Sequence, residues 1–116
     1  MAGQYDITVD RGTTLLRTFT VTDSNNVPVS YQGYSAKMQV RKDHSASTVI
    51  VEASTANGRI TLNNQGVITL TIADEVTATF SVGTAYYDIM LTSPSGDAIK
   101  FMEGKFVVQP SVTRLP

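Results

Sequence analysis

The residue types that carry out acid–base or nucleophilic chemistry meet at one place in this chain, Asp43-His44-Ser45. A catalytic relay needs a nucleophile, a base and an orienting carboxylate that converge from different directions. Neighbours in sequence project apart, so these three residues cannot form one. We expect His44, the only histidine, to be a solvated loop residue, and we expect no catalytic residues and no enzyme activity.

Carboxylates suited to metal binding are also poorly placed. Asp6 and Asp10 share one face of a predicted strand, but at that spacing they lie roughly 13 Å apart, too far to hold one ion. Asp74 and Glu75 begin a predicted helical turn, where carboxylates complement the positive end of the helix dipole. Cysteine is absent, and the sequence has no histidine pair and no phosphate-binding glycine loop. The sequence predicts no metal site, no cofactor and no small-molecule substrate.

Tyrosines offer one alternative binding chemistry. Exposed aromatic rings on a sandwich edge can stack on sugars, and Tyr31 and Tyr34 could form such a rim with the polar loop around His44. Tryptophan is absent, and Tyr86 and Tyr87 belong to another segment. Packing at a loop or core margin is the competing interpretation of these rings. A glycan- or host-surface-binding module is therefore the alternative function.

Composition indicates one domain over residues 1–116. A chain of this length buries roughly two-thirds of its surface, enough for one core without disulfides. Nine Lys and Arg against ten Asp and Glu give a formal charge of -1 with neither sign in a block, so nucleic-acid binding is not expected. No window approaches the ~20 apolar residues of a membrane span, and the N-terminus lacks a secretory signal. We expect a protein made in the cytoplasm, without membrane contact.

Alternation of apolar and polar residues predicts an all-β fold. The clearest case is 34–41, where Tyr34, Ala36, Met38 and Val40 alternate with polar side chains. The predicted strands are 5–9, 13–22, 34–41, 49–53, 59–62, 67–72, 83–92, 99–103 and 106–109. Residues 73–80 predict at most one short helical turn, as a crossover between sheets. Seven to nine short strands separated by turn signals are typical of an antiparallel β-sandwich with Greek-key connections.

Two glycine positions carry more specific predictions. Asn57-Gly58 tolerates the positive φ of tight primed turns and predicts a β-hairpin leading into 59–62. Gly104 stands where the inward parity changes between 99–103 and 106–109, which predicts a β-bulge.

Arg17 breaks the pattern of its strand, because it occupies an apolar position. It either pairs with a carboxylate at the core edge or marks a change of parity. A third interpretation makes it an anchor in a subunit interface, together with the threonines beside it, Thr18 and Thr20. Short, stiff threonines lose little side-chain entropy when covered. Arg114 and Leu115 join this candidate interface, because the ends of the chain, 1–4 and 111–116, are predicted to be arms that order against neighbours.

The order of segments resembles the small immunoglobulin-like proteins and domains of tailed bacteriophages. The matching elements are Gly12-Thr13 followed by Arg17-Thr18-Phe19, the strand from Gly33-Tyr34 to Arg41, Asn57-Gly58-Arg59-Ile60, Gly83 with Tyr86-Tyr87-Asp88, and Glu103-Gly104 through Val112-Thr113-Arg114. Related sequences often place Leu-Pro before the glycine at position 83, where this chain has Phe80-Ser81-Val82. That departure affects the crossover turn alone.

The resemblance implies an immunoglobulin-like sandwich and a non-enzymatic function. Such proteins are baseplate, tail-fibre-attachment, neck or head-decoration components, or N-terminal domains of upper baseplate proteins. The expectation for this chain is a virion protein that assembles in several copies and bridges other virion structural proteins. The family brings no catalytic residues to carry over.

Overall fold

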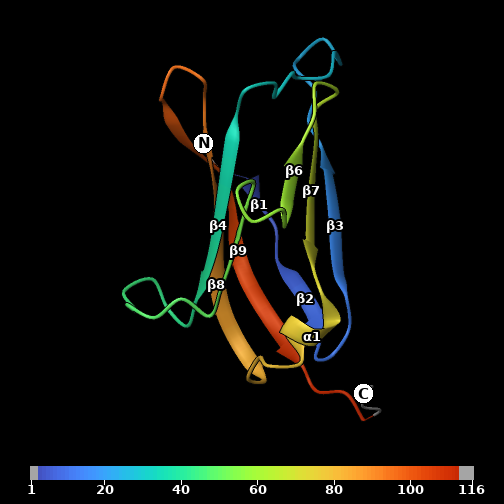
Figure 1. The fold of residues 1–116 in the computed structure, drawn as a ribbon, viewed down its shortest axis with the longest axis vertical. Coiled ribbons are helices and arrows are strands. Elements are labelled where there is room, and N and C mark those ends of the chain that lie inside the picture. Colours follow the sequence, from blue (N-terminus) through green and yellow to red (C-terminus); the bar gives the residue numbers. More distant parts are fainter. Residues whose placement is uncertain (1–2, 113–116) are drawn as a thin grey trace.

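The structure, a computed structural model, describes residues 3–112. These residues form two β-sheets packed face to face, with one short helix at one end (Figure 1). The elements are β1 (Gly3–Gln4), β2 (Ile7–Asp10), β3 (Leu15–Thr20), β4 (Ser35–Arg41), β5 (Val51–Ser54), β6 (Ile60–Leu62), β7 (Val67–Ile72), α1 (Asp74–Thr77), β8 (Gly83–Thr92) and β9 (Ala98–Gln109). The predicted all-β sandwich is confirmed, as is the single helical turn within 73–80. No helix in the described range is long and apolar enough to cross a membrane.

The strand order is that of an immunoglobulin-like sandwich. The larger sheet has the order β1-β9-β8-β4-β5, with β2 also paired to β9, and the smaller sheet has the order β3-β7-β6. Across the smaller sheet, β3, β7 and β6 take the places of immunoglobulin strands B, E and D. Across the larger sheet, β4, β8 and β9 take those of C, F and G. Connections that cross between the sheets give the Greek-key arrangement. Pairings between the described strands are antiparallel, except that β1 and β2 run parallel to β9.

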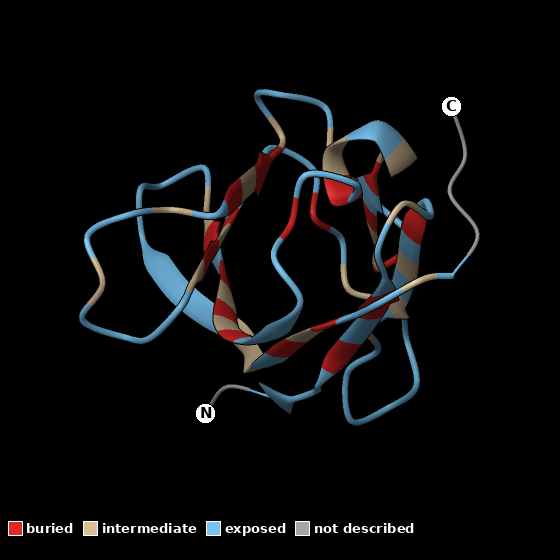
Figure 2. Cartoon of the chain, turned by 90° about the horizontal axis from the view of Figure 1, so that it is seen from below, coloured by how far each residue is buried: buried red, intermediate tan, exposed pale blue. Residues whose placement is uncertain are grey.

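The core lies between the two inner faces, and the alternation in the sequence decides what enters it. Ile68, Leu70 and Ile72 of β7 are fully buried, and so are Ile89 and Leu91 of β8. Figure 2 shows the result as red bands that recur along the strands. Burying a side chain of this size stabilises the fold by about 1.5–3 kcal/mol. A slip of one residue would expose a whole row, so each register is fixed.

The helix α1 depends on a threonine for its position. It has four residues, too few for a stable isolated helix, and its N-cap Ala73 makes no side-chain hydrogen bond. Thr77 is fully buried, and its hydroxyl donates to the carbonyl of Thr13 at 2.7 Å and accepts from the amide of Gly12 at 3.1 Å. The crossover between the sheets is thereby tied to the turn between β2 and β3.

The predicted Asn57-Gly58 hairpin is wrong, although the two residues do lie in a turn. β5 pairs with β4 and β6 pairs with β7, so the turn connects the two sheets. Gly58 has the positive φ of 79°, whereas Asn57 contributes its side chain. Its Oδ1 accepts from the amides of Ser54 at 2.9 Å and Arg59 at 3.0 Å. β6 pairs with β7 because this pairing buries Ile60 in the core. The two turn residues alone do not indicate which strand β6 will pair with.

The predicted bulge at Gly104 is also wrong. The register of β9 on β8 shifts at Phe101, and Gly104 pairs regularly with Tyr87. A Cβ at Gly104 would lie 2.2 Å from the carbonyl oxygen of Tyr5. Glycine is therefore required here because the N-terminal segment passes against the backbone of β9.

Replacing Thr77 by valine should destabilise the protein by about 1–3 kcal/mol, because it leaves the Gly12 amide and the Thr13 carbonyl without their partner. Urea unfolding would measure the difference. Thr79→Val is the matched control, since Thr79 is exposed and bonds only within its own turn. Equal losses for the two variants would contradict the role of Thr77.

Candidate functional site

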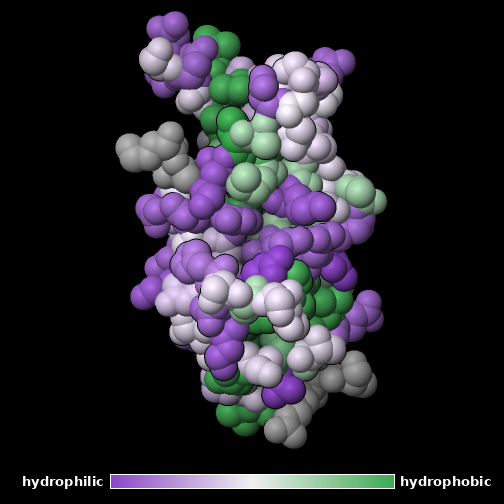
Figure 3. Space-filling view, turned by 90° about the vertical axis from the view of Figure 1, so that its left-hand side faces the viewer, coloured by the Kyte–Doolittle hydropathy of each residue, from purple (hydrophilic) through white to green (hydrophobic). Residues whose placement is uncertain are grey.

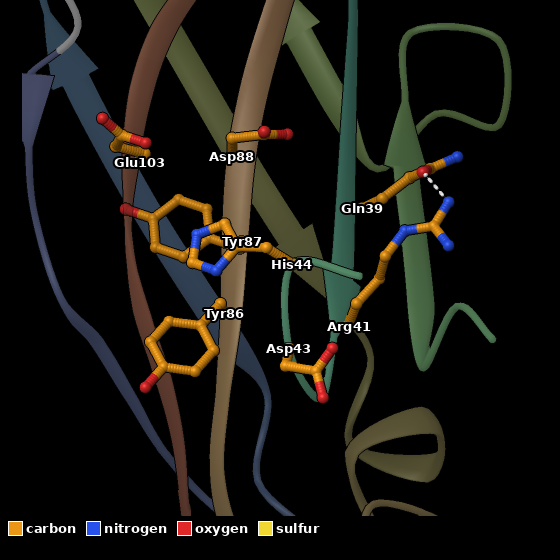
Figure 4. Close-up of a pocket in the computed structure, with 8 residues that line it drawn as sticks. All are labelled: Gln39, Arg41, Asp43, His44, Tyr86, Tyr87, Asp88 and Glu103. Atoms are coloured by element: carbon orange, nitrogen blue, oxygen red, sulfur yellow. Dashed lines mark hydrogen bonds between the residues drawn. The ribbon is translucent and has the colours of Figure 1, made fainter. Parts of the chain in front are cut away.

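A shallow polar hollow of about 150 Å³ lies on the outer face of the larger sheet, across β4, β8 and β9 (Figure 4). The sheet register positions its side chains: Gln39 lies opposite Asp88, Arg41 opposite Tyr86, and Asp88 opposite Glu103. The lining residues are Gln39, Arg41, Asp43, His44, Tyr86, Tyr87, Asp88 and Glu103. In Figure 3 this region is a polar band with apolar surface above and below it.

The basic side chain of this hollow is engaged by the protein itself. Arg41 donates to the carbonyl of Ala46 at 2.7 Å and to Oε1 of Gln39 at 2.8 Å. The amide of Gln39 in turn donates to Glu52 at 2.8 Å. This chain of hydrogen bonds fixes the start of the loop after β4 and uses two of the guanidinium donors that an anionic ligand would need.

The Asp43-His44-Ser45 segment is arranged as a turn. The Asp43 carboxylate accepts from the hydroxyl and the amide of Ser45, both at 3.0 Å. These hydrogen bonds lower the pKa of Asp43, which weakens it as a base. The His44 ring lies against Tyr86, with ring centroids 5.1 Å apart. The hydroxyl and the carboxylate thus bond each other, and the imidazole packs on an aromatic ring.

The acidic side chains of the hollow are balanced by one lysine. Lys100 Nζ lies 3.3 Å from Glu103 and 3.8 Å from Asp88, and the Gln4 amide donates to Glu103 at 3.1 Å. Within residues 3–112, no three His, Cys, Asp or Glu side chains gather as metal ligands would. Asp6 has a structural partner instead, because its carboxylate accepts from the amide of Lys105 at 2.9 Å.

The three residues of the predicted glycan rim are not brought together. Tyr31 and Tyr34 form an edge-to-face pair with centroids 5.3 Å apart, beside a hollow of about 530 Å³ that Gln32 and Asn63 also line. Tyr31 is buried and Tyr34 half-buried. His44 follows the other end of β4, and a strand of seven residues separates it from Tyr34 by roughly 20 Å. Of the three predicted rim residues, the two tyrosines lie together and His44 does not.

Arg17 connects the edges of the two sheets. Its side chain is half-buried on the inner parity of β3, and the parity of that strand is unbroken, with Leu15 and Phe19 also inward. The guanidinium donates to the carbonyl of Thr8 on β2 at 2.8 Å and to that of Leu16 at 3.0 Å. Within the described part of the chain, Arg17 has neither the predicted carboxylate partner nor the predicted change of parity. Arg17 thus bonds one carbonyl of β3 and one carbonyl of β2, where the edges of the two sheets meet.

Thr18 and Thr20 point outward from the smaller sheet. Thr18 lies opposite Thr69, which lies opposite Thr61 on β6, so threonines from three strands form one row. Leu16 lies on the same face and is 56% exposed. Arg114 and Leu115 lie outside the described residues.

The outer edge of the larger sheet is also occupied by side chains. The carbonyl of Glu52 on β5 accepts from Arg59 at 2.8 Å and from the Asn57 amide at 3.0 Å. Side chains that cover edge carbonyls reduce the capacity of a strand to pair with another chain. The sequence interpretation missed both residues, because their acceptor is a backbone group that every residue carries.

An apolar hollow of about 400 Å³ at the end of the sandwich was also not predicted. It lies between the loop after β4 and the turn before β8, and Ile50 and Val82 on its rim are 43% and 51% exposed. The available signal was Val82 itself, an apolar residue in a turn and outside any strand alternation.

Comparisons with protein-family models and with curated proteins found no match. Among solved structures, the chain is similar to the N-terminal domain of phage TP901-1 ORF48, with a TM-score of 0.50 and 14% identity over 90% of this chain and 85% of that one. Two looser similarities carry no argument. CopC from Methylosinus trichosporium OB3b has a TM-score of 0.41 and 13% identity over 85% of this chain and 100% of that one. Drosophila OTK extracellular domains 3–5 have a TM-score of 0.37 and 15% identity over 96% of this chain and 33% of that one. The chain therefore has an immunoglobulin-like fold that a phage protein domain shares.

Replacing Arg17 by leucine should lower stability by about 1 kcal/mol, the contribution of a partly exposed hydrogen-bonded arginine. It should also cause concentration-dependent aggregation, because the Thr8 and Leu16 carbonyls on two strand edges become free. Urea unfolding and light scattering would measure the two effects. Lys37→Leu on the exposed outer face of β4 is the control for added apolar surface. Aggregation of both variants to the same extent would argue against protection of the edges by Arg17.

Tyr87 should make stability fall at high pH. Its hydroxyl is buried and donates to the carbonyl of Tyr5, and this burial raises the pKa of Tyr87 well above its ordinary value of 10.0. Above pH 10 the unfolded chain loses the phenolic proton while the folded chain keeps it, so stability falls by up to ~1.4 kcal/mol per pH unit for each such group. Burial raises the pKa of Tyr31 in the same direction. Between pH 9 and about 11.5, the free energy of unfolding measured in urea should fall less steeply with pH for Tyr87→Phe than for the unchanged protein. An equal slope for the two proteins would contradict a raised pKa of Tyr87.

Proposed function

We propose that the protein is a non-enzymatic structural component of a tailed-phage virion, which assembles in several copies and bridges other virion proteins of the tail, baseplate, fibre attachment or neck. The observation that carries the proposal is the fold shared with a phage protein domain over 90% of the chain. The order of sequence segments points the same way.

The outer face of the smaller sheet supports contacts of this kind. Its threonines have few rotamers to lose, so covering them has a small entropic cost. Leu16 adds exposed apolar area at one side of the row. Because Arg17 and the pair Asn57 and Arg59 occupy edge carbonyls, docking would use this face or the ends of the sandwich.

Binding to a glycan is the second candidate function, and one observation favours it. The Tyr31–Tyr34 pair borders an open hollow together with the amide side chains of Gln32, Asn63 and Asn64, which are donors and acceptors suited to sugar hydroxyls. Tyr31 is buried, so Tyr34 would supply the stacking surface.

Purified particles of a phage that encodes the chain would test the proposal. Quantitative mass spectrometry should find the protein at a fixed number of copies per particle after density-gradient purification, and cross-linking should join it to neighbouring virion proteins. Thr69→Lys should reduce its incorporation, whereas Thr14→Lys, at an exposed position in the turn before β3, should not. Absence from particles, combined with glycan-array binding that Tyr34→Ala abolishes, would replace the structural role by the second candidate.

A further inference from the structure

The apolar hollow at the end of the sandwich has a floor that belongs to the core. Phe80, Ala85, Phe106 and Val108 line it, and all four are buried, with Phe80 and Phe106 packed edge to face at 5.9 Å between centroids. Ile50 and Val82 on the rim are the exposed part. The hollow is therefore an opening into the core that the loops within residues 3–112 leave uncovered.

The hollow is large enough to accept side chains. An apolar cavity of about 150 Å³ holds a benzene-sized group, and this one measures about 400 Å³. Two aliphatic side chains would fit in it. Figure 3 shows apolar surface at this lower end of the molecule, below the polar band.

The chain also carries an exposed apolar side chain at the same end. β9 ends at Gln109, Pro110 follows, and Val112 is fully exposed at 102%. Figure 1 shows the chain leaving the lower end of the sandwich on the side of β2 and β3, whereas the loop after β4 lies on the opposite side. Val108 lines the hollow, whereas Val112 is not among the lining residues and its side chain is fully exposed.

We propose that this hollow binds the segment 111–116 of a second copy, with Val112 and Leu115 as the inserted side chains. Both the hollow and the departing segment are at one end of the molecule, so two copies placed end to end about a two-fold axis exchange the contact reciprocally, which closes the assembly as a dimer. Arg114 lies between the two inserted residues, and α1, which leads into the hollow's lining, carries Asp74 and Glu75 as complementary charges. The inference extends the proposed assembly in several copies, but it concerns the isolated protein, so either proposal can fail alone.

Sedimentation velocity of the full chain over a wide concentration range tests the proposal. We expect a concentration-dependent dimer that Val82→Asp and Val112→Asp each weaken at least about tenfold, because each substitution alters an aliphatic side chain in both of the reciprocal contacts. Val27→Asp is the matched control, because Val27 is a 53% exposed valine in the turn between β3 and β4, at the far end of the sandwich. Thermal unfolding should be alike for the three variants, since each replaces an exposed side chain.

A mixture of two variants makes the test specific. The Val82→Asp protein keeps an intact tail and the Val112→Asp protein keeps an intact hollow, so mixing them should restore one of the two contacts and recover part of the association. Failure of the mixture to associate, a monomer at every concentration, or equal weakening by Val27→Asp would overturn the proposal. So would a change in the amide resonances of Ile50 and Val82 caused by Val112→Asp in the dilute monomer, because the tail would then bind its own chain.

Discussion

The rest of the structure depends on how the N-terminal segment is attached to β9. Between β1 and β2 the chain bends at Tyr5 and Asp6, and the bend passes so close to Gly104 that no side chain fits there. Three hydrogen bonds hold the bend: the Tyr87 hydroxyl to the Tyr5 carbonyl, the Tyr5 amide to the Glu103 carbonyl at 3.0 Å, and the Lys105 amide to the Asp6 carboxylate at 2.9 Å. The parallel strand β2 follows from this attachment, and with it the burial of Ile7 and Val9.

Closure of the sandwich on that side is a consequence. Once β2 lies along β9, the Thr8 carbonyl comes within reach of Arg17 from the opposite sheet. The guanidinium, with several donors in a planar fork, can occupy two carbonyls at once, which a lysine could do less well. On the far edge, Asn57 and Arg59 cover the Glu52 carbonyl in the same way. The edge strands of a small sandwich carry backbone groups that are not paired with another strand. Here side chains, mainly arginines, bond some of these edge carbonyls without an additional strand.

The sequence alone was sufficient to predict where the strands lie and insufficient to predict which strands pair with one another. Alternation placed β4, β7 and β8 within one residue of their observed bounds, because burial acts on every second residue and is therefore visible in the pattern of side chains. Tertiary pairing is not written locally. The turn at Asn57-Gly58 looks the same whether the next strand returns to β4 or crosses to β7, and Gly104 could be explained only by a segment about a hundred residues away. For Arg17, parity was readable, but the partners were backbone carbonyls, which no pattern of side chains reveals.

The partners of the polar loop side chains are also backbone groups, which a pattern of side chains does not reveal. These partners bear on function. Polar side chains in the loops hold turns: Asp23 accepts from the amides of Asn25 and Val27, Asn63 from those of Gln65 and Val67, and Asp43 from that of Ser45. A sandwich without a disulfide needs such local anchors, because most of the stability lies in contacts between distant segments. A carboxylate that accepts two hydrogen bonds is stabilised in its charged form and becomes a weaker base. The Asp43 carboxylate therefore cannot both define its turn and serve as a strong base. Among the described residues, the row of threonines on one face and the apolar opening at one end take no part in these turns and present surface for recognition.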